Sequence, residues 1–350
     1  MKILLYTPAF LPQIGGLEIN IANQAEHLTR AGCEVVVATT TAGPDDPALP
    51  FRVVRRPGPA QLLRWVRWCD IFFQANVSLR GLWPLLLVRR PWVVSHHSWY
   101  CRSDGRVAWQ DRLKRRLLRH AAASIAVSHA LAAHLETPTL VIANPYRDGL
   151  FRILPPPAGS ARDGGLVFVG RLVSDKGMDV LLDALARLAG EGLTPRLTVI
   201  GDGPEAAPLR EQARRLGLAD RVDFLGTRTG EELVACLNRH RILTVPSRYA
   251  EPFGIVALEG IACGCVVVGS ERGGLKDAIG RCGRTFRNGD AADLARVLGD
   301  LLRHPEADAE ILRHAEEHLA RHRSERITAA YLEVLAGVLE AGGPAGRGGG

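Results

Sequence analysis

Short, almost continuously apolar runs alternate with amphipathic segments along most of the chain, and this alternation limits the folds that the chain can adopt. Runs such as KILLYT (2–7), EVVVATT (34–40) and WVVS (92–95) lack the polar alternation of a strand with one solvated face. Strands buried on both faces have this composition, and the segments between them supply the helical crossovers that parallel strands require. The pattern therefore predicts an α/β fold with parallel sheets covered by helices on both faces.

The pattern divides into two similar halves. In the first half we expect strands at 2–7, 34–40, 51–55, 70–74, 92–95, 124–127 and 139–142, and helices at 16–31, 60–68, 78–88, 107–120 and 128–135. In the second half we expect strands at 166–170, 196–200, 222–225, 241–245 and 265–269, and helices at 177–189, 205–216, 230–239, 252–263, 290–303, 305–320 and 324–340. Two Rossmann-like domains facing each other across a cleft fit this order.

The expected domain limits follow from composition. The stretch RILPPPAGSARDGG (152–165) contains three consecutive prolines, which small and polar residues follow, as in linkers. We therefore expect an N-terminal domain at 1–154, a linker at 155–164 and a C-terminal domain at 165–322. A helix at 323–340 and a disordered tail at 341–350 complete the chain.

Charge separates the two halves. Residues 1–154 hold 19 Lys and Arg against 10 Asp and Glu, a balance of +9, whereas residues 155–350 hold 25 against 27, a balance of −2; together they give the net +7. All six tryptophans also lie in the first half.

The apolar run LWPLLLV (82–88) is too short to span a bilayer, and MKILLYTPAF reads as a strand rather than a signal peptide. Seven cysteines without a CxxC pair favour free thiols and a cytoplasmic protein.

Two glutamates flank an apolar stretch in EPFGIVALEG (251–260). We expect a helix at 252–263 with Pro252 at its first position and Glu251 as its N-cap or the neighbour of the N-cap. Eight residues of helix would separate Glu251 from Glu259 by roughly 12 Å. The carboxyls of glycoside hydrolases lie about 5 Å apart in retaining enzymes and about 6.5–9.5 Å apart in inverting ones. The pair therefore reads as two separate ligand contacts, or alternatively as two solvated surface glutamates.

Glycine-rich loops follow several of the predicted strands, where ligands of α/β sheets bind. A glycine pair precedes a helix start, which offers free N–H groups to an anion. In VFVGRLVSDKGMDV (167–180) two cations stand beside a helix start, a pattern typical of a diphosphate site. Ordinary turn glycines and helix caps are the alternative interpretation. The residues concerned are Gly15 and Gly16 in PQIGGLE, Arg171 and Lys176, and Gly201 in VIGDGP.

These motifs, in this order, resemble the retaining GT-B glycosyltransferases of family 4. The resemblance runs from Lys2 to about Leu339. It is strongest in GRLVSDKGMDVLLDAL, VIGDGPEAAPLREQARRLGLADRVDFLG and VPSRYAEPFGIVALEGIACGCVVVGS, and the spacing E-x7-E of Glu251 and Glu259 is the signature of the family. The resemblance implies transfer of a hexosyl unit from a nucleoside-diphosphate sugar to a hydroxyl acceptor, with retention and without an essential metal. It also implies that the last helix returns to the first domain.

The resemblance assigns a role to each matching residue. Arg171 and Lys176 would hold the donor diphosphate and stabilise the leaving group. Glu259 would bind the ribose hydroxyls, and Glu251 would bind hydroxyls of the transferred sugar. The amides of Phe253 and Gly254 would contact the donor, with Gly15, Gly16 and Gly201 lining its site.

The family also places an active-site histidine after the fifth strand. In VVSHHSWY two adjacent histidines stand there, and strand register favours His97 over His96.

Three departures from the family pattern concern the acceptor side. Asn144-Pro145-Tyr146 replaces the asparagine-glycine expected after the last strand of the first domain, and Lys276-Asp277 replaces a proline-glutamate pair. The first domain is also short. UDP- and GDP-sugars are the expected donors, and the acceptor is a glycolipid, a polysaccharide or a natural product.

Other functions fit the sequence less well. A nicotinamide dehydrogenase would need GxGxxG after the first strand, and this chain has none there. HAEEH (314–318) matches a zinc peptidase pattern, but it lies in a charged helix without an evident third ligand. A catalytically inactive nucleotide-sugar-binding partner protein remains the alternative to an enzyme.

The basic, tryptophan-rich segment WQDRLKRRLLRH (109–120) gives the first domain a distinctive surface. No nucleic-acid-binding motif accompanies its charge, so we expect no nucleic-acid partner. An amphipathic basic helix with an interfacial tryptophan suits an anionic membrane surface or an acidic acceptor, and a solvated helix face is the alternative. The residues expected on this acceptor or membrane side are Trp109, Arg112, Arg115 and Arg116, which would place the protein peripherally at the inner face of the membrane.

Overall fold

The computed structural model describes residues 1–13, 15–44, 46–101, 106–155, 162 and 165–342. The chain forms two compact units. Unit 1 consists of Met1–Asn144 with Ser324–Gly350, and unit 2 consists of Pro145–Arg323. The units therefore divide at Asn144–Pro145, ahead of the linker expected at 155–164, which lies largely outside the described residues, as does most of the tail expected at 341–350. Among the described residues, no helix has both the length and the apolar composition needed to cross a membrane.

Unit 1 is built on a seven-stranded parallel sheet with the order β3-β2-β1-β4-β5-β6-β7. Valine-rich strands pair in register, for example Leu4 with Val36, and most of their side chains are buried. The strands are β1 (Lys2–Thr7), β2 (Glu34–Thr39), β3 (Arg52–Arg55), β4 (Ile71–Ala75), β5 (Trp92–His96), β6 (Ala123–Ala126) and β7 (Leu140–Val141). The helices are α1 (Gly16–Arg30), α2 (Pro59–Trp68), α3 (Leu79–Leu82), α4 (Trp109–Leu117), α5 (His129–His134) and α14 (Ser324–Gly342), with 3-10 turns η1 (Trp83–Leu86) and η2 (Leu118–His120).

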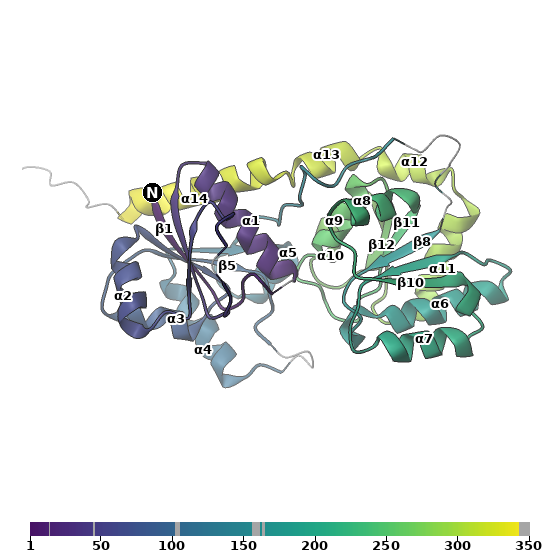
Figure 1. The fold of residues 1–350 in the computed structure, drawn as a ribbon, viewed down its shortest axis with the longest axis horizontal. Coiled ribbons are helices and arrows are strands. Elements are labelled where there is room, and N and C mark those ends of the chain that lie inside the picture. Colours follow the sequence, from purple (N-terminus) through teal and green to yellow (C-terminus); the bar gives the residue numbers. More distant parts are fainter. Residues whose placement is uncertain (14, 45, 102–105, 156–161, 163–164, 343–350) are drawn as a thin grey trace, which may run out of the picture. The chain divides into compact units, whose positions relative to one another are not determined.

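Helices α1 and α14 cover one face of this sheet, and α2 and α3 lie on the other (Figure 1). The apolar face of α14 presents Ile327, Tyr331 and Leu335 to the sheet, and the Tyr331 ring lies 5.9 Å from that of Phe73. These three side chains are at least nine-tenths buried, so the C-terminal helix forms part of the core of unit 1. This burial ties the end of the chain to its first domain.

Unit 2 is built on a six-stranded parallel sheet with the order β10-β9-β8-β11-β12-β13. Its strands are β8 (Leu166–Val169), β9 (Leu197–Ile200), β10 (Val222–Gly226), β11 (Ile242–Val245), β12 (Val266–Ser270) and β13 (Gly283–Phe286). Its helices are α6 (Met178–Gly190), α7 (Ala206–Arg215), α8 (Gly230–Arg239), α9 (Ile255–Ala262), α10 (Leu275–Ile279), α11 (Ala291–Arg303), α12 (Ala307–Leu312) and α13 (Ala315–Ala320), with 3-10 turns η3 (Ser174–Lys176) and η4 (Ala219–Arg221). Helices α6, α7 and α11 share one core with the strands, and α8 and α9 lie on the opposite side of the sheet (Figure 1).

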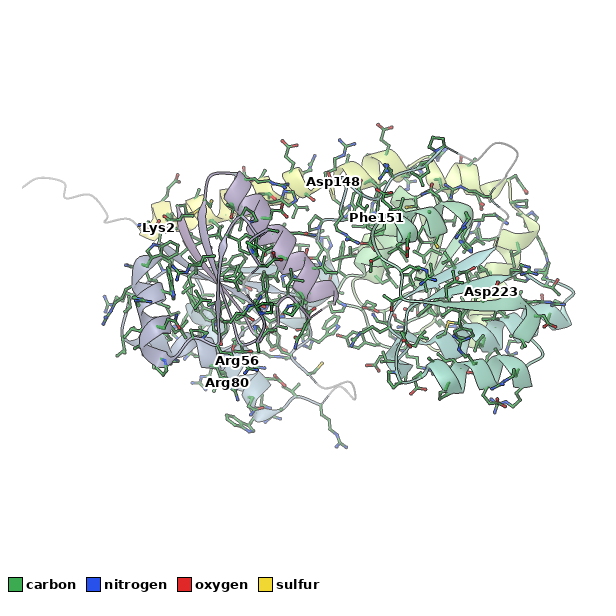
Figure 2. The ribbon with its side chains drawn as sticks, viewed as in Figure 1. Lys2, Arg56, Arg80, Asp148, Phe151 and Asp223 are labelled. Carbon is green, nitrogen blue, oxygen red and sulfur yellow. The ribbon has the colours of Figure 1, made fainter. Side chains whose placement is uncertain are left out.

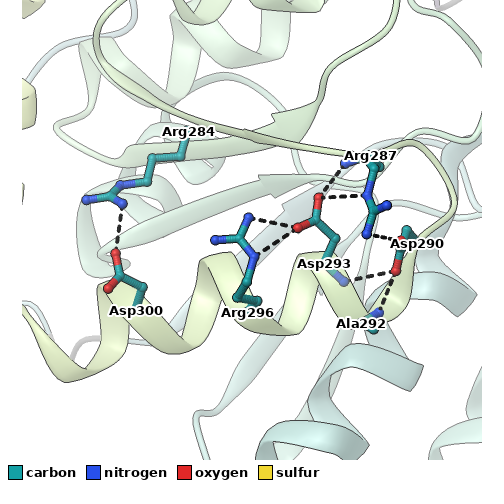
Figure 3. Close-up of polar contacts among 7 residues, drawn as sticks. All are labelled: Arg284, Arg287, Asp290, Ala292, Asp293, Arg296 and Asp300. Carbon is teal, nitrogen blue, oxygen red and sulfur yellow. Dashed lines mark hydrogen bonds and ion pairs between the residues drawn. The ribbon is translucent and has the colours of Figure 1, made fainter.

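Charged side chains fix α11 against the end of β13 (Figure 3). Asp290 caps the helix by accepting hydrogen bonds from the amides of Ala292 and Asp293. The Asp293 carboxylate accepts from the Arg287 amide at 2.9 Å and from the Arg296 guanidinium. These contacts stabilise the positive end of the α11 dipole with two carboxylates.

The predicted α/β fold with two parallel sheets is confirmed, and several local expectations were wrong. Helices 78–88 and 305–320 are each broken into two shorter pieces, the first where Pro84 enters a 3-10 turn. No element was expected at α10 or at β13. The helix expected at 252–263 begins at Ile255, because Gly254 has a left-handed φ of 100° that a helix cannot contain.

Candidate active site

Unit 2 gathers charged side chains at the point where the order of its strands reverses. From β8 the chain continues to β9 on one side, and from the neighbouring β11 it continues to β12 on the other side. Ligands of doubly wound sheets bind in the crevice between two such strand ends. The loop after β8 carries Arg171 and Lys176, and the loop after β11 carries Ser247 and Glu251. The topology therefore places four of the polar side chains of this unit at a ligand-binding position.

A buried three-residue cluster forms there. The Lys176 Nζ atom donates to Glu251 Oε1 at 2.6 Å, and the Ser247 hydroxyl donates to the same oxygen at 2.6 Å. Glu251 is only 7% exposed, whereas 30% of the Lys176 side chain remains accessible. The carboxylate thus holds the ammonium group in place while leaving part of it open to a ligand.

The backbone around this cluster is held by close contacts that require glycine. Gly177 has a φ of 65°, and a Cβ there would lie 2.0 Å from the Pro246 carbonyl oxygen. Gly273 has a φ of 85° and pairs with Glu251, and a Cβ there would lie 2.4 Å from the Glu251 carbonyl oxygen. Since any larger residue would force these loops apart, both glycines fix the distance between Lys176 and Glu251.

Arg171 supplies a second cation at the same strand end. Its side chain is exposed, and within the described residues it makes no ion pair. Its backbone carbonyl accepts from Val173, which turns the chain toward η3 and Lys176. Arg171 is therefore available to an anion, whereas Lys176 is already positioned by Glu251.

Glu259 lies within α9 and faces a cation that the sequence did not suggest. The Arg147 guanidinium is 3.7 Å from Glu259 Oε1, and Arg147 also stacks over the Phe151 ring, which is labelled in Figure 2. Only 14% of the Glu259 side chain is exposed. Burial raises the pKa of Glu259 to about 7, although the charge of Arg147 opposes that rise. This carboxyl therefore changes its charge near neutral pH.

The start of α9 differs from the expectation. Glu251 is not the N-cap and Pro252 is not in the helix, since Gly254 is the N-cap. Phe253 is 2% exposed and its ring packs 5.9 Å from that of His322. The two glutamates consequently stand on different elements, and Glu251 contacts Lys176 instead of acting as an isolated side chain at a helix start.

Gly201 has a structural reason to be glycine. Its φ is 141°, and a Cβ would lie 1.9 Å from the Gly170 carbonyl oxygen at the end of β8. The exits of β8 and β9 can approach each other only because this position lacks a side chain. The residue thus shapes the loop that carries Arg171.

In unit 1 the expected glycine pair stands at the start of α1. Gly15 is the N-cap, and a Cβ there would lie 2.4 Å from the Glu18 carboxylate. Gly16 is exposed, and a Cβ there would meet no atom of the described residues within 4 Å. Because the chain itself does not require a glycine at 16, the space in front of it is open to a ligand.

The two adjacent histidines have different surroundings. His96 is fully buried in β5, with Nδ1 2.7 Å from the Tyr100 hydroxyl and Nε2 3.0 Å from the Ser124 hydroxyl. Burial, followed by the nearby His97, lowers the pKa of His96 to about 3. His96 is therefore a neutral core residue with both ring nitrogens engaged.

His97 lies just beyond the end of β5 and is only half-buried. Its Nε2 atom is 2.9 Å from the Ser95 hydroxyl, and the side chain of Asn144 also hydrogen-bonds its ring. Burial lowers the pKa of His97 to about 4, against the opposing effect of the Asn144 bond. Its imidazole is neutral at physiological pH and lies at the carboxyl end of β5, an inner strand of the sheet.

Two asparagine side chains form hydrogen bonds near the carboxyl end of β5, and the sequence had pointed to one of them, Asn144. Asn76, with a φ of 61°, accepts from the backbone amides of His97 at 2.8 Å and of Ser98 at 3.2 Å. Asn144 accepts from the Asn20 side chain at 3.0 Å. A single sequence offers no periodic signal for such loop contacts, and only the unusual Asn144-Pro145 pair drew attention to one of them.

The basic helix α4 does not present all its cations to solvent. Trp109 is 69% exposed, Leu113 is 38% exposed, and Arg112 and Arg116 are also exposed. Arg115 instead turns inward, donating to the Tyr100 carbonyl at 3.2 Å and lying 2.7 Å from His134 Nε2. These contacts separate Arg115 from the exposed Arg112 and Arg116, and its expected place on the acceptor or membrane side stays a prediction.

The HAEEH segment is divided by the start of α13. His314 is the N-cap of that helix, and His318 Nε2 lies 2.8 Å from the Ala278 carbonyl oxygen. His318 also contacts His322, whose ring centroid is 4.7 Å away. These contacts give His318 a packing role against α10.

Two family profiles match consecutive parts of the chain. The profile described as Glycosyltransferase Family 4 matches residues 14–144, and the profile described as Glycosyl transferases group 1 matches residues 160–318. Together they cover Gly15 and Gly16 at the start of α1 and the loops after β5, β8 and β11 that carry the other residues described above.

Individual relatives match parts or most of the chain. A D-inositol 3-phosphate glycosyltransferase of Stackebrandtia nassauensis is 36% identical over 185 residues, which span 49% of this chain and 42% of that protein. The chain thus spans less than half of that curated relative. A 2-deoxystreptamine N-acetyl-D-glucosaminyltransferase of Streptomyces fradiae is 28% identical over 361 residues, covering 84% of both chains.

A solved structure matches almost the whole chain. The crystal structure of Anabaena HepE in complex with UDP and glucose has a TM-score of 0.80, with 23% identity over 96% of this chain and 100% of HepE. At this identity the likeness shows the fold, which is GT-B. The fold and the two consecutive profiles establish that the chain belongs to the glycosyltransferases of family 4, the glycosyl transferases group 1.

Proposed function

We propose that this protein transfers a hexosyl unit from a nucleoside-diphosphate sugar to a hydroxyl acceptor, with retention at the anomeric carbon and without an essential metal. The observation that carries this proposal is the Lys176–Glu251 pair at the strand-order reversal of unit 2, with Arg171 exposed at the same strand end. Two cations at the carboxyl ends of parallel strands suit a diphosphate.

The chemical role of these cations follows from where charge develops. When the bond between the anomeric carbon of the sugar and the diphosphate oxygen breaks, negative charge accumulates on the leaving nucleoside diphosphate. Lys176 and Arg171 stabilise that charge, and fixed cations are worth most when they need no reorganisation during the reaction. Glu251 and Ser247 supply this fixation by holding the Lys176 side chain.

Glu259 serves as the contact for the ribose hydroxyls. Its carboxylate accepts hydrogen bonds when ionised, and its mostly buried position strengthens such bonds. Arg147 keeps part of the population ionised near neutral pH by opposing the effect of burial. The amides at the start of α9, beyond Phe253, add donors for the donor sugar or phosphate.

The neutral imidazole of His97 contacts the transferred sugar or the acceptor hydroxyl. A neutral histidine both donates and accepts hydrogen bonds, as a sugar hydroxyl requires. Gly15 and Gly16 leave space for a phosphate at the start of α1. The acceptor proton passes to a phosphate oxygen of the donor.

UDP is the donor nucleotide to test first. HepE, which shares the fold, was solved with UDP and glucose. A GDP-sugar is the second candidate. The acceptor is a glycolipid, a polysaccharide or a small natural product such as the aminocyclitol of the Streptomyces fradiae relative.

We also propose that the protein acts in the cytoplasm, peripherally at the inner face of the membrane. The exposed Trp109, Leu113, Arg112 and Arg116 of α4 suit an anionic lipid surface. Co-sedimentation with anionic vesicles that is lost in Trp109→Ala would support this contact, and equal binding to neutral and anionic vesicles would exclude it.

A transfer assay tests the activity directly. Purified protein is incubated with UDP-glucose or GDP-mannose and a panel of hydroxyl acceptors in EDTA, and the anomeric configuration of any product is read by NMR. An α-linked product from an α-linked donor supports retention. Nucleotide binding without transfer to any acceptor would instead support the alternative, a catalytically inactive nucleotide-sugar-binding partner of a glycan assembly system.

A further inference from the structure

Unit 1 contains a cavity that none of the proposed donor contacts uses. It has a volume of about 360 Å³ and lies beyond the carboxyl ends of β1, β2 and β3. Its lining includes Tyr6, Thr40, Arg56, Leu62, Arg80 and Trp83. This volume falls at the lower end of the range for small-molecule sites, about 300–1,000 Å³.

Two arginines give the cavity its charge. Arg56 and Arg80 both line it, and Figure 2 labels both on the same side of unit 1. None of the described residues that line it is acidic. Within the described part of the chain Arg80 is exposed and makes no ion pair, and the guanidinium of Arg56 makes one hydrogen bond, from Nε to the Thr40 carbonyl oxygen at 3.3 Å. Both guanidinium groups therefore keep donors for an anion.

The backbone holds both arginines at the cavity. Arg56 has a φ of 47°, a region that arginine rarely adopts, and its amide donates to Thr39 at 2.7 Å. Next to Arg80, a Cβ at Gly81 would lie 2.7 Å from the Gln74 side chain and 2.8 Å from the Tyr6 ring. Glycine at 81 therefore allows the segment carrying Arg80 and Trp83 to pack directly on Tyr6.

Helix α2 adds a third favourable group. It spans ten residues from Pro59, it carries no acidic residue in its first turn, and both Pro59 and Leu62 line the cavity. The first turn of α2, where the positive end of the helix dipole lies, therefore forms part of the cavity wall. The apolar part of the wall, formed by Leu62 and Trp83, suits the carbon skeleton of a ligand.

We infer that this cavity binds the phosphate group of a phosphorylated acceptor. The bidentate geometry of arginine matches phosphate oxygens, and two such groups with a helix start are a strong anion site. The identification of the ligand as an acceptor rests on the proposed glycosyl transfer, whereas phosphate binding itself does not. The phosphate can belong to a soluble sugar phosphate or to a phospholipid headgroup.

Calorimetric titration tests the inference. Wild-type protein should bind glucose 6-phosphate at least tenfold more tightly than glucose, and Arg56→Gln with Arg80→Gln should weaken glucose 6-phosphate binding by about tenfold or more. Arg67→Gln, which removes an exposed arginine from the opposite end of α2, should leave that binding unchanged. Arg80→Gln alone provides a variant that breaks no described side-chain contact, should the double variant fold poorly.

Binding to vesicles distinguishes a phospholipid headgroup from a soluble sugar phosphate as the source of the phosphate. Sedimentation with phosphatidate vesicles but not with phosphatidylcholine vesicles, lost in the double variant, would identify a lipid phosphate. UDP binding is measured in parallel, and it should be unaffected by both arginine substitutions. If UDP fails to bind, the proposed transferase function fails while phosphate binding stands. The inference is overturned if glucose 6-phosphate and phosphatidate vesicles each bind the wild type and the double variant equally well. It is also overturned if neither of these ligands binds the wild type.

Discussion

Unit 2 places paired charges at the carboxyl ends of β8 and β11, whereas unit 1 places neutral hydrogen-bonding groups at the end of β5. Lys176 with Glu251 and Arg147 with Glu259 are ion pairs with mostly buried carboxylates. His97, Ser95 and Asn144 form a network without a net charge. The two sheets have the same strand order through their first six strands, so topology does not explain the difference. The difference suits a division in which the ends of β8 and β11 bind the diphosphate and the end of β5 binds hydroxyl groups.

Removing the fixed cation should have the largest effect. Lys176→Ala should lower the rate of transfer roughly 100-fold or more, because a preorganised charge at the leaving group is lost. Initial rates with a saturating UDP-sugar measure this. Arg187→Ala is the control, since Arg187 is an exposed cation on α6 of the same unit, away from the proposed donor contacts. Equal losses in both variants would remove Lys176 from the site.

The partner of that cation should matter less. Glu251→Gln keeps an acceptor oxygen for Ser247 but removes the charge that holds Lys176, so we expect transfer to fall about tenfold or more. Nucleotide binding should change by less than about threefold. Glu251→Ala should preserve nucleotide binding and depress transfer further. Unchanged transfer in both variants would show that Glu251 only supports the loop.

The two histidines offer a comparison within unit 1. His97→Ala should lower transfer by about tenfold or more with a small loss of stability. His96→Ala should lower the free energy of unfolding by about 1–3 kcal/mol, because the buried Tyr100 and Ser124 hydroxyls each lose a partner. Thermal melts and initial rates of both variants separate the two effects. The reverse pattern would make His96 the active-site residue.

The smallest expected effect is a pH dependence of nucleotide binding. Because burial raises the pKa of Glu259 to about 7, its carboxylate is mostly protonated at pH 6 and mostly ionised at pH 8. Affinity for UDP should rise by up to about tenfold between these values if the ribose contact needs the carboxylate. Titrations with Glu259→Gln, which cannot ionise, isolate this contribution from the ionisation of UDP itself.

The same raised pKa has a consequence for folding. The unfolded carboxyl ionises near its ordinary pKa of 4.5, whereas the folded one ionises near 7. The contribution of Glu259 to stability is therefore full below about pH 4.5 and is lost as the pH rises through 7. Denaturant titrations over this pH range should show that the difference in the free energy of unfolding between the wild type and Glu259→Gln becomes smaller as the pH falls.

The sequence predicted the periodic parts of the molecule and missed the loop geometry. Apolar runs such as 34–40 predict buried parallel strands because their composition reflects burial on both faces. The residue pattern singled out the site residues on the loops after β8 and β11, and the resemblance supplied their roles. The direct contact of Lys176 with Glu251 was not predicted, because 75 positions separate them. Arg147 was missed for the same reason. Pro252 suggested a helix start that the positive φ of Gly254 prevents.

Nucleotide binding tests the central claim that unit 2 is a diphosphate site. Thermal unfolding is followed with UDP, GDP, ADP, CDP and dTDP, each with and without EDTA. A ligand at 100 times its Kd should add about 2.7 kcal/mol to the stability of the folded state. We predict a rise in melting temperature with UDP or GDP that persists in EDTA and is lost in Lys176→Ala. A melting temperature that none of the five nucleotides changes would contradict the account.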